Sequence, residues 1–296
     1  MFTFARFSFA LCLSCLGIAA SVAAQPPAPP GCAFAEAPAS SFTVRVPFDV
    51  VDGRIYVQAR VNGRGPFRFA VDTGASGLGR ADKLLVSALD LKVVGTSSTS
   101  DGVQSATVDT VQLDTLELGG LSKRGVEAIT RDYGSRMKAD AAFHGILARD
   151  FFADGLLILD YPNKTLSFSP TLSLPAGGDS LLRYERAFRV PVTIGEHRME
   201  ANLDSGANVS LVVPQALYDK VSRAPLQEAG PGTLTNTRIE TRRGVLDQPL
   251  TIGSARLAGV EARVSERFPE VLVGAHVLQN YTVLIDQRAK LIALCD

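Results

Sequence analysis

The chain contains one short motif twice, and this repeat constrains its fold more than any other feature. Residues 69–76, FAVDTGAS, recur 132 residues later as residues 201–208, ANLDSGAN. Each copy ends an apolar, strand-like run and places Asp, a hydroxyl residue and Gly where the chain must turn sharply, which Gly permits because it has no Cβ. A single copy is compatible with an ordinary Asx-type turn, but two copies in matching settings indicate a duplicated unit.

The repeat continues downstream of each motif. Residues 145–152 align with residues 271–278, and the apolar runs 156–160 and 282–286 then coincide without a gap. Short apolar runs punctuated by Gly, Pro and Asp dominate both halves, which is typical of β-strands joined by tight turns. We therefore expect two β lobes built on the same plan, each supplying one carboxylate at the end of a hairpin strand.

These residues resemble the aspartic proteases of the pepsin and retropepsin clan, in which Asp-Thr/Ser-Gly is followed by an apolar-apolar-Gly segment and a closing strand. Retropepsins carry one such unit and dimerise, whereas pepsins carry two in one chain. This sequence is similar to pepsins in its arrangement and to retropepsins in the size of its units and their Asp-Thr/Ser-Gly-Ala motifs. The resemblance covers residues 42–296 and implies an all-β, bilobal pepsin-like fold of two retropepsin-like β-barrel lobes, with the active cleft between them.

The resemblance also implies an activity, that of an aspartic endopeptidase. A water molecule activated between Asp72 and Asp204 would hydrolyse peptide bonds in a peptide or unfolded protein substrate, without a cofactor. Two carboxylates a hydrogen bond apart cannot both ionise cheaply, so one keeps a proton and serves as the acid while the other serves as the base. Because the pair titrates as a unit, the sequence does not assign these two roles to individual residues.

The neighbours of the two Asp residues have expected supporting roles. By resemblance, Thr73 and Ser205 hydrogen-bond across the lobe interface, while Gly74 and Gly206 let backbone N–H groups approach the carboxylates. Pepsins carry Ser or Thr at the next position, where this chain has Ala75 and Ala207. One hydrogen bond fewer to a charged carboxylate depresses its pKa less, so we expect optimal activity in mild acid, about pH 4 to 6.5.

A polar stretch at residues 95–104 lies where the family places its flap hairpin, and Asp-Gly within it is a turn signal. The expected tip consists of Ser100, Asp101, Gly102 and Val103. A plain exposed loop is the alternative reading. Residues 233–239 occupy the corresponding place in the second unit, so one flap or two flaps are both compatible with the sequence. No Tyr lies between residues 95 and 110, and a pepsin-like flap tyrosine is therefore absent.

Two residues depart from the family pattern. Ala148 stands where the first unit would have Gly, and Asn208 replaces the small hydroxyl residue that Ser76 supplies in the first unit. Neither change removes a catalytic group. The alternative to a protease is a catalytically silent binding or scaffold protein on the same fold, although such a protein would need neither carboxylate. A Ser or Cys hydrolase is disfavoured because the chain has neither a Gly-x-Ser-x-Gly motif nor a reactive-cysteine context.

The ends of the chain and its composition indicate an exported protein. Residues 1–24 are typical of a signal peptide, with an uncleaved anchor or a lipid-modified Cys15 as alternatives. A Pro/Ala-rich arm at residues 25–41 precedes the expected lobes at residues 42–170 and 188–296, which a linker at residues 171–187 joins. We expect localisation to a bacterial periplasm or secretion, no membrane insertion after removal of the signal, and a monomer.

The charge balance, the cysteines and the histidines limit which partners, crosslinks and metals the sequence predicts. The 30 basic and 30 acidic side chains balance, so electrostatics give no case for nucleic acid as a partner. Outside the signal segment only Cys32 and Cys295 remain, and in an oxidising compartment we expect them to form a disulfide, with two free thiols as the alternative. The three histidines stand singly, without the spacing of metal ligands, so we expect no metal site.

Overall fold

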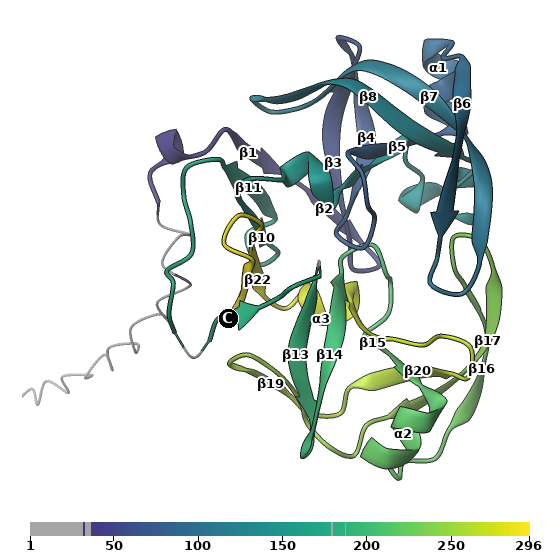
Figure 1. Cartoon of the computed structure of the whole chain (residues 1–296), viewed down its shortest axis with the longest axis vertical. Coiled ribbons are helices and arrows are strands. Elements are labelled where there is room, and N and C mark those ends of the chain that lie inside the picture. Colours follow the sequence, from purple (N-terminus) through teal and green to yellow (C-terminus); the bar gives the residue numbers. More distant parts are fainter. Residues whose placement is uncertain (1–31, 33–36, 179, 187) are drawn as a thin grey trace, which may run out of the picture.

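A computed structural model describes residues 32, 37–178, 180–186 and 188–296 (Figure 1). The expected signal segment and most of the Pro/Ala-rich arm lie outside these residues. The fold is all-β and bilobal, with 52% strand against 12% helix. No helix among the described residues is long and apolar enough to cross a membrane.

The first lobe is built on an eight-stranded sheet with the order β2-β3-β4-β9-β5-β8-β7-β6. An additional pairing of β3 with β7 closes this sheet on itself. Its strands are β2 (Asp49–Val51), β3 (Arg54–Val61), β4 (Arg64–Asp72), β5 (Gly79–Asp82), β6 (Val93–Ser100), β7 (Ser105–Leu118), β8 (Leu121–Arg131) and β9 (Gly145–Ala148).

The second lobe repeats this plan in a nine-stranded sheet with the order β16-β17-β20-β15-β21-β14-β13-β18-β19. Its strands are β13 (Arg189–Ile194), β14 (His197–Asp204), β15 (Leu211–Pro214), β16 (Gln227–Thr233), β17 (Arg238–Val245), β18 (Leu250–Ile252), β19 (Ala255–Leu257), β20 (Glu261–Ser265) and β21 (Val271–Gly274). Strand β4 runs parallel to β9 and β14 runs parallel to β21, so that Asp72 lies opposite Ala148 and Asp204 opposite Gly274.

A third sheet joins the two lobes, with the order β1-β11-β10-β22-β23-β12. It comprises β1 (Val44–Pro47), β10 (Leu156–Asp160), β11 (Thr165–Ser169), β12 (Leu182–Arg183), β22 (Thr282–Asp286) and β23 (Leu291–Cys295). The closing strands of the two units, β10 and β22, pair antiparallel with each other. Strand β12 lies within the stretch expected as a linker and hydrogen-bonds to β23, so part of that connection belongs to the shared sheet.

Helices are few and short in the described part of the chain, and they follow the repeat. They are α1 (Lys83–Leu89), α2 (Gln215–Val221) and α3 (Ala275–Leu278), with 3-10 turns η2 (Ala39–Ser41), η3 (Gly134–Arg136), η4 (Ala139–Ala141) and η5 (Arg149–Phe152). Helix α1 follows β5 as α2 follows β15, and η5 follows β9 as α3 follows β21. Asp82 caps α1, because its side chain accepts a hydrogen bond from the backbone N–H of Leu84 at 2.8 Å.

Strand alternation directs both Asp residues away from the main core. Successive side chains of a strand point to opposite faces of the sheet. Phe69 and Val71 of β4 belong to the main core, whereas Ala70 belongs to a separate buried cluster on the other face. Leu203 of β14 likewise points into the main core. Asp72 and Asp204 therefore share the face opposite the core, and there the candidate site forms.

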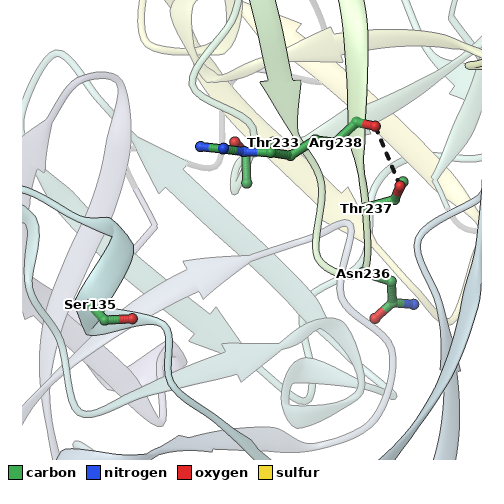
Figure 2. A pocket seen from close by; sticks show the side chains of 5 residues that line it. All are labelled: Ser135, Thr233, Asn236, Thr237 and Arg238. Atoms are coloured by element: carbon green, nitrogen blue, oxygen red, sulfur yellow. Dashed lines mark hydrogen bonds between the residues drawn. The ribbon is translucent and has the colours of Figure 1, made fainter.

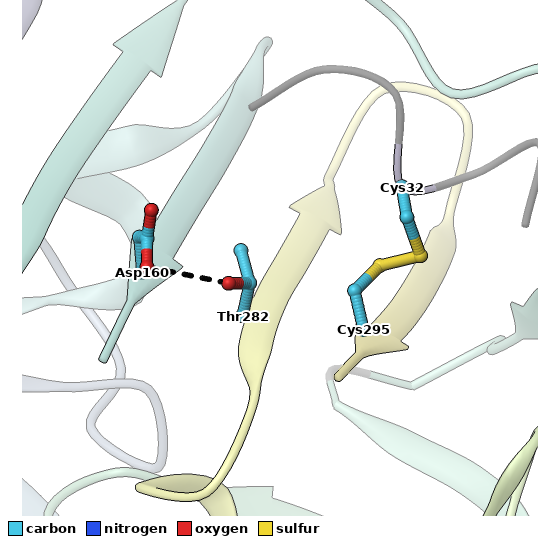
Figure 3. The surroundings of a disulfide bond; sticks show 4 residues. All are labelled: Cys32, Asp160, Thr282 and Cys295. Atoms are coloured by element: carbon cyan, nitrogen blue, oxygen red, sulfur yellow. Dashed lines mark hydrogen bonds between the residues drawn. A yellow bond between two sulfur atoms is a disulfide. The ribbon is translucent and has the colours of Figure 1, made fainter. Parts of the chain in front are cut away.

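Cys32 and Cys295 form a disulfide that ties the N-terminal arm to β23 (Figure 3). The two Cα atoms are 5.7 Å apart, and 263 residues separate the cysteines in the sequence. The structure therefore contains the disulfide expected from the cysteine count. A crosslink that closes a long loop stabilises a fold chiefly by restricting the unfolded chain.

Candidate active site

The two repeated loops bring Asp72 and Asp204 face to face. Strand β4 ends on Asp72 and β14 ends on Asp204. The Cα of Gly74 lies against the carboxylate of Asp204, and the Cα of Gly206 lies against that of Asp72, so closely that a Cβ on either glycine would collide with the opposite carboxylate. Each loop thus packs on the acid of the other lobe, and the two acids form a pair.

Backbone N–H groups orient both carboxylates. The N–H of Ala75 donates to Oδ1 of Asp72 at 2.9 Å, and the N–H of Gly206 donates to Oδ1 of Asp204 at 2.8 Å. A carboxylate oxygen held in this way cannot rotate freely. The remaining oxygens of the two acids are the groups available for chemistry.

Thr73 and Ser205 lock the two loops together across the lobe interface. The hydroxyl of Thr73 donates to the carbonyl of Leu203 at 3.0 Å and accepts from the N–H of Ser205 at 3.0 Å. The hydroxyl of Ser205 donates to the carbonyl of Val71 at 2.9 Å and accepts from the N–H of Thr73 at 3.1 Å. Thr73 is 2% exposed and Ser205 is fully buried, so water competes with none of these four bonds.

Burial makes one acid of the pair hard to ionise. Desolvation, reinforced by the negative charge of Asp72, raises the pKa of Asp204 from its ordinary value of 3.8 to about 7. The N–H of Gly206 and the positive charge of Arg54 act in the opposite direction but are outweighed. The pair therefore holds one proton from mild acid to near neutral pH, as a general acid and base in one site require.

Stability should fall as the pH rises through this range. A carboxyl whose pKa is higher in the folded than in the unfolded state binds more protons when folded, so the free energy of unfolding decreases between about pH 4 and pH 7. Asn does not titrate, so Asp204→Asn should lack this decrease. Its free energy of unfolding should therefore rise relative to that of the wild type by about 1 to 4 kcal/mol from pH 4 to pH 7. Urea denaturation of both proteins at pH 4.5 and 7.5 measures the difference. Parallel losses in the two proteins would contradict it.

Arg54 connects the first lobe to the loop that carries Asp204. Its Nε donates to the carbonyl of Gly206 at 2.7 Å and its Nη2 donates to Oδ1 of Asn208 at 3.0 Å. Asn208 in turn donates to Asp52 at 2.7 Å, and the ring of His276 lies 2.9 Å from the same carboxylate. Sequence analysis noted Asn208 only as a departure from the family pattern. Its amide in fact links the two lobes beside the acid pair.

The other departure, Ala148, is accommodated without loss of this geometry. Ala148 is fully buried, and its N–H donates to the carbonyl of Leu78 at 3.2 Å. The corresponding Gly274 has no such room, since a Cβ there would collide with the carbonyls of Val209 and Ala207. The segment at Gly274 therefore packs more tightly on the Asp204 loop than the segment at Ala148 packs on the Asp72 loop.

Two hairpins meet tip to tip beside the site. In the β6–β7 hairpin, Gly102 adopts a left-handed conformation with φ of 85° at the turn. The side chain of Asp101 accepts from the backbone of Val103 and Gln104 in the same tip and, at 2.7 Å, from the N–H of Asn236 in the β16–β17 turn. The amide of Asn236 donates to the carbonyls of Thr99 at 2.9 Å and Gln104 at 2.7 Å. These hydrogen bonds join the two lobes.

Further contacts surround the second hairpin tip. Val103 of the first hairpin packs against a buried apolar cluster of the second lobe, formed by Ile239, Phe268 and Leu272. A polar pocket of about 540 Å³ lies between this hairpin and η3 of the first lobe (Figure 2). It is lined by Ser135, Thr233, Asn236, Thr237 and Arg238. The side chains of Asp101 and Val103, within the candidate flap at residues 100–103, therefore contact the other lobe, unlike those of an isolated surface loop.

We expect Asn236→Ala to loosen the contact between the hairpin tips. The substitution removes both amide donors and the acceptor of Arg131 but leaves the backbone N–H that reaches Asp101. Amide hydrogen exchange in residues 97–106 and 231–240 should accelerate about tenfold, since two hydrogen bonds are worth about 1 to 2 kcal/mol. Ser105→Ala, an exposed change in the same hairpin, is the control. Equal exchange in Asn236→Ala and wild type would exclude a latching role.

Two small buried clusters flank the acid pair, one in each lobe. The first-lobe cluster contains Ala75 and Ile146, together with Tyr56 and Phe143. The second-lobe cluster contains Leu272 and Phe268, with Ala207 packed against it. Ala75 belongs to the first cluster and Ala207 packs against the second, and each follows an Asp-Thr/Ser-Gly motif. Each cluster therefore lies beside one of the two Asp-containing loops.

The sequence matches the family described as aspartyl protease twice, over residues 57–151 and residues 190–277. The two matches together span more than half of the chain, and each contains one Asp of the pair. A comparison with curated proteins gives no match.

Proposed function

The chain belongs to the aspartyl protease family, and from this premise we propose that it is an aspartic endopeptidase in which Asp72 and Asp204 together activate water. The single observation that carries this proposal is the facing pair of partly buried carboxylates, one of which has a raised pKa. Such a pair offers a proton donor and a proton acceptor at the same point.

The proposed reaction uses both members of the pair in turn. The ionised carboxylate takes a proton from water as the water oxygen attacks the scissile carbonyl carbon, and the protonated carboxyl donates its proton to the carbonyl oxygen. The tetrahedral intermediate then collapses, the C–N bond breaks, and the leaving nitrogen receives a proton from the pair. Thr73 and Ser205 hold the two loops in register throughout, so that the acids keep their separation.

The substrate is proposed to be an extended peptide or an unfolded protein. The hairpin tips join the two lobes, and one buried cluster lies beside each Asp-containing loop. We therefore propose that a chain enters between the lobes and that the tips part to admit it. One chain supplies both acids, so we propose a monomer. A disulfide is stable only in an oxidising compartment, which supports our proposal of an exported enzyme.

A silent binding or scaffold protein is the competing proposal. It would use the same cleft and the same hairpins but would not need a raised pKa or an acid pair held by backbone donors. Peptide binding without turnover distinguishes it from an enzyme. The enzyme proposal is favoured because a second, partly buried carboxylate beside the first lowers the stability of the fold, a cost that a silent binding protein has no reason to retain.

Cleavage of denatured casein across pH 3 to 8 tests the proposed function. We expect cleavage with an optimum in mild acid and its inhibition by a statine-type transition-state analogue, which mimics the tetrahedral intermediate. Folded protein that binds the analogue but cuts neither casein nor a peptide library would favour the silent binding protein. Cleavage insensitive to the analogue would indicate a different chemistry.

A further inference from the structure

Arg80 occupies the wall of the first-lobe cluster, beside the catalytic loop. In β5, Ala81 points into the main core, so Arg80 points to the opposite face. Arg80 pairs directly with Ile146 of β9 and lies beside Ile129 of β8, and directly paired residues share a face of the sheet. Ile146 belongs to the cluster that contains Ala75. The guanidinium therefore stands on the side of the sheet that faces the acid pair.

The repeat shows how unusual this residue is. Val212 in β15 pairs with Leu272 as Arg80 pairs with Ile146, and both strands follow the catalytic loop of their lobe. Val212 packs into the second-lobe cluster, which is apolar. At this equivalent position of the two lobes, the first lobe therefore has the cation of Arg80 and the second lobe has the isopropyl group of Val212.

The charge of Arg80 is not neutralised within the described part of the chain. Arg80 is only partly exposed, its Nε is buried without a hydrogen-bond partner, and it forms no ion pair with any described residue. Asp82 lies two residues further along the same face, but its two oxygens accept backbone N–H groups of Leu84, Tyr133 and Gly134. A partly buried cation without a counterion is costly, so an anion in this region would be bound favourably.

Tyr133 supplies a second unmet group at the same place. Its ring packs on Phe143 with centroids 5.6 Å apart, and its hydroxyl is buried without a hydrogen-bond partner. Burial raises the pKa of Tyr133, and the positive charge of Arg80, whose guanidinium lies beside the phenol oxygen, opposes this rise. The negative charge of Asp72 adds a smaller contribution to the rise.

We propose that the first-lobe wall forms a subsite for an acidic side chain, Asp or Glu, whose carboxylate pairs with Arg80 and accepts a hydrogen bond from Tyr133. The related second-lobe subsite, with Val212 in place of Arg80, binds an apolar side chain. The substrate is then a peptide with an acidic residue on one side of the scissile bond and an apolar residue on the other. This inference deepens the proposed function and rests on it for the direction in which the peptide lies.

A side chain without a carboxylate would leave Arg80 and the Tyr133 hydroxyl without a partner. The subsite should therefore discriminate strongly between acidic and uncharged side chains. A site built to bind a polar group rejects an analogue that lacks it more effectively than an apolar site rejects an isostere. Gln has nearly the size of Glu but no charge, so a comparison of Glu with Gln isolates the ion pair. We expect at least a tenfold preference for Glu, as for other hydrogen bonds to charged groups.

This proposal can be tested at pH 6 with internally quenched peptides that differ only in having Glu, Gln or Leu at one position. That position is scanned on both sides of the scissile bond. We expect kcat/KM to favour Glu over Gln at least tenfold at one position, and Arg80→Met to remove that preference and to shift selectivity toward Leu. Arg80→Lys, which keeps the charge, should retain part of the preference for Glu. It keeps the proposal testable if Arg80→Met fails to fold. Arg64→Met, at an exposed position of the same lobe, is the control and should behave as wild type.

Binding measurements separate this inference from the proposed function. Calorimetry with non-cleavable hydroxyethylene peptides containing Glu or Gln requires no turnover. Tighter binding of the Glu peptide that depends on Arg80, without cleavage of any substrate, would support the subsite and overturn the endopeptidase. If the wild type cleaves and binds the Glu and Gln peptides equally well, the subsite proposal is wrong and the endopeptidase proposal is unaffected.

Discussion

Asp72→Asn and Asp204→Asn should each lower kcat/KM for peptide cleavage by at least about a thousandfold. Each substitution replaces a group that exchanges protons with an amide that does not, while the acid of the other lobe remains in place. The two acids act as a unit, so the double variant should be no worse than either single variant by more than a small factor. Initial rates on one quenched peptide at pH 5 measure all three.

The fold should survive these changes, which makes the loss interpretable. Asn has the shape of Asp and keeps a carbonyl oxygen to accept the N–H of Ala75 or Gly206. Asp49→Asn, an exposed change in β2 of the first lobe, is the matched control and should retain full activity. If either active-site variant kept more than a tenth of wild-type activity with an unchanged pH profile, the chemistry would not depend on that carboxylate.

The meeting of the two acids was predictable from the sequence because the cause is local and repeated. Asp72 and Asp204 each end an apolar strand and precede the same short loop, so the duplication predicts a symmetrical encounter. The all-β, two-lobed fold follows from the same repeat, and the short helices follow from its register. The disulfide was predictable because only two cysteines lie outside residues 1–24.

Other contacts between the lobes were not predictable, because no repeated motif marks the residues that make them. Arg54 and Gly206 are 152 positions apart, and nothing around Arg54 distinguishes it from other strand arginines. The pairing of β10 with β22 and the contact of Asp101 with Asn236 likewise depend on tertiary placement. Arg80 is different, because aligning the two halves of the repeat sets it against Val212 and would have marked the asymmetry.

Gly74→Ala and Gly206→Ala should each lower kcat at least about a hundredfold while leaving the protein folded. A Cβ on Gly74 would lie within 2.7 Å of an oxygen of Asp204, and a Cβ on Gly206 equally close to Asp72, distances that real Cβ contacts do not show. The methyl group added to one lobe therefore acts on the acid of the other. The four bonds of Thr73 and Ser205 prevent the loops from separating, so the carboxylate itself must move.

A displacement of about 1 Å at the reacting group is enough for such a loss, because proton transfer depends steeply on distance and alignment. We propose that the substrate contacts the two clusters rather than the glycines, so KM should change much less than kcat. Gly177→Ala is the matched control, since a Cβ there meets open space, and it should have wild-type kinetics. Variants of Gly74 and Gly206 with activity within twofold of wild type would show that the acids tolerate a wider separation than the locked loops allow, and the mechanism of a closely paired dyad would then fail.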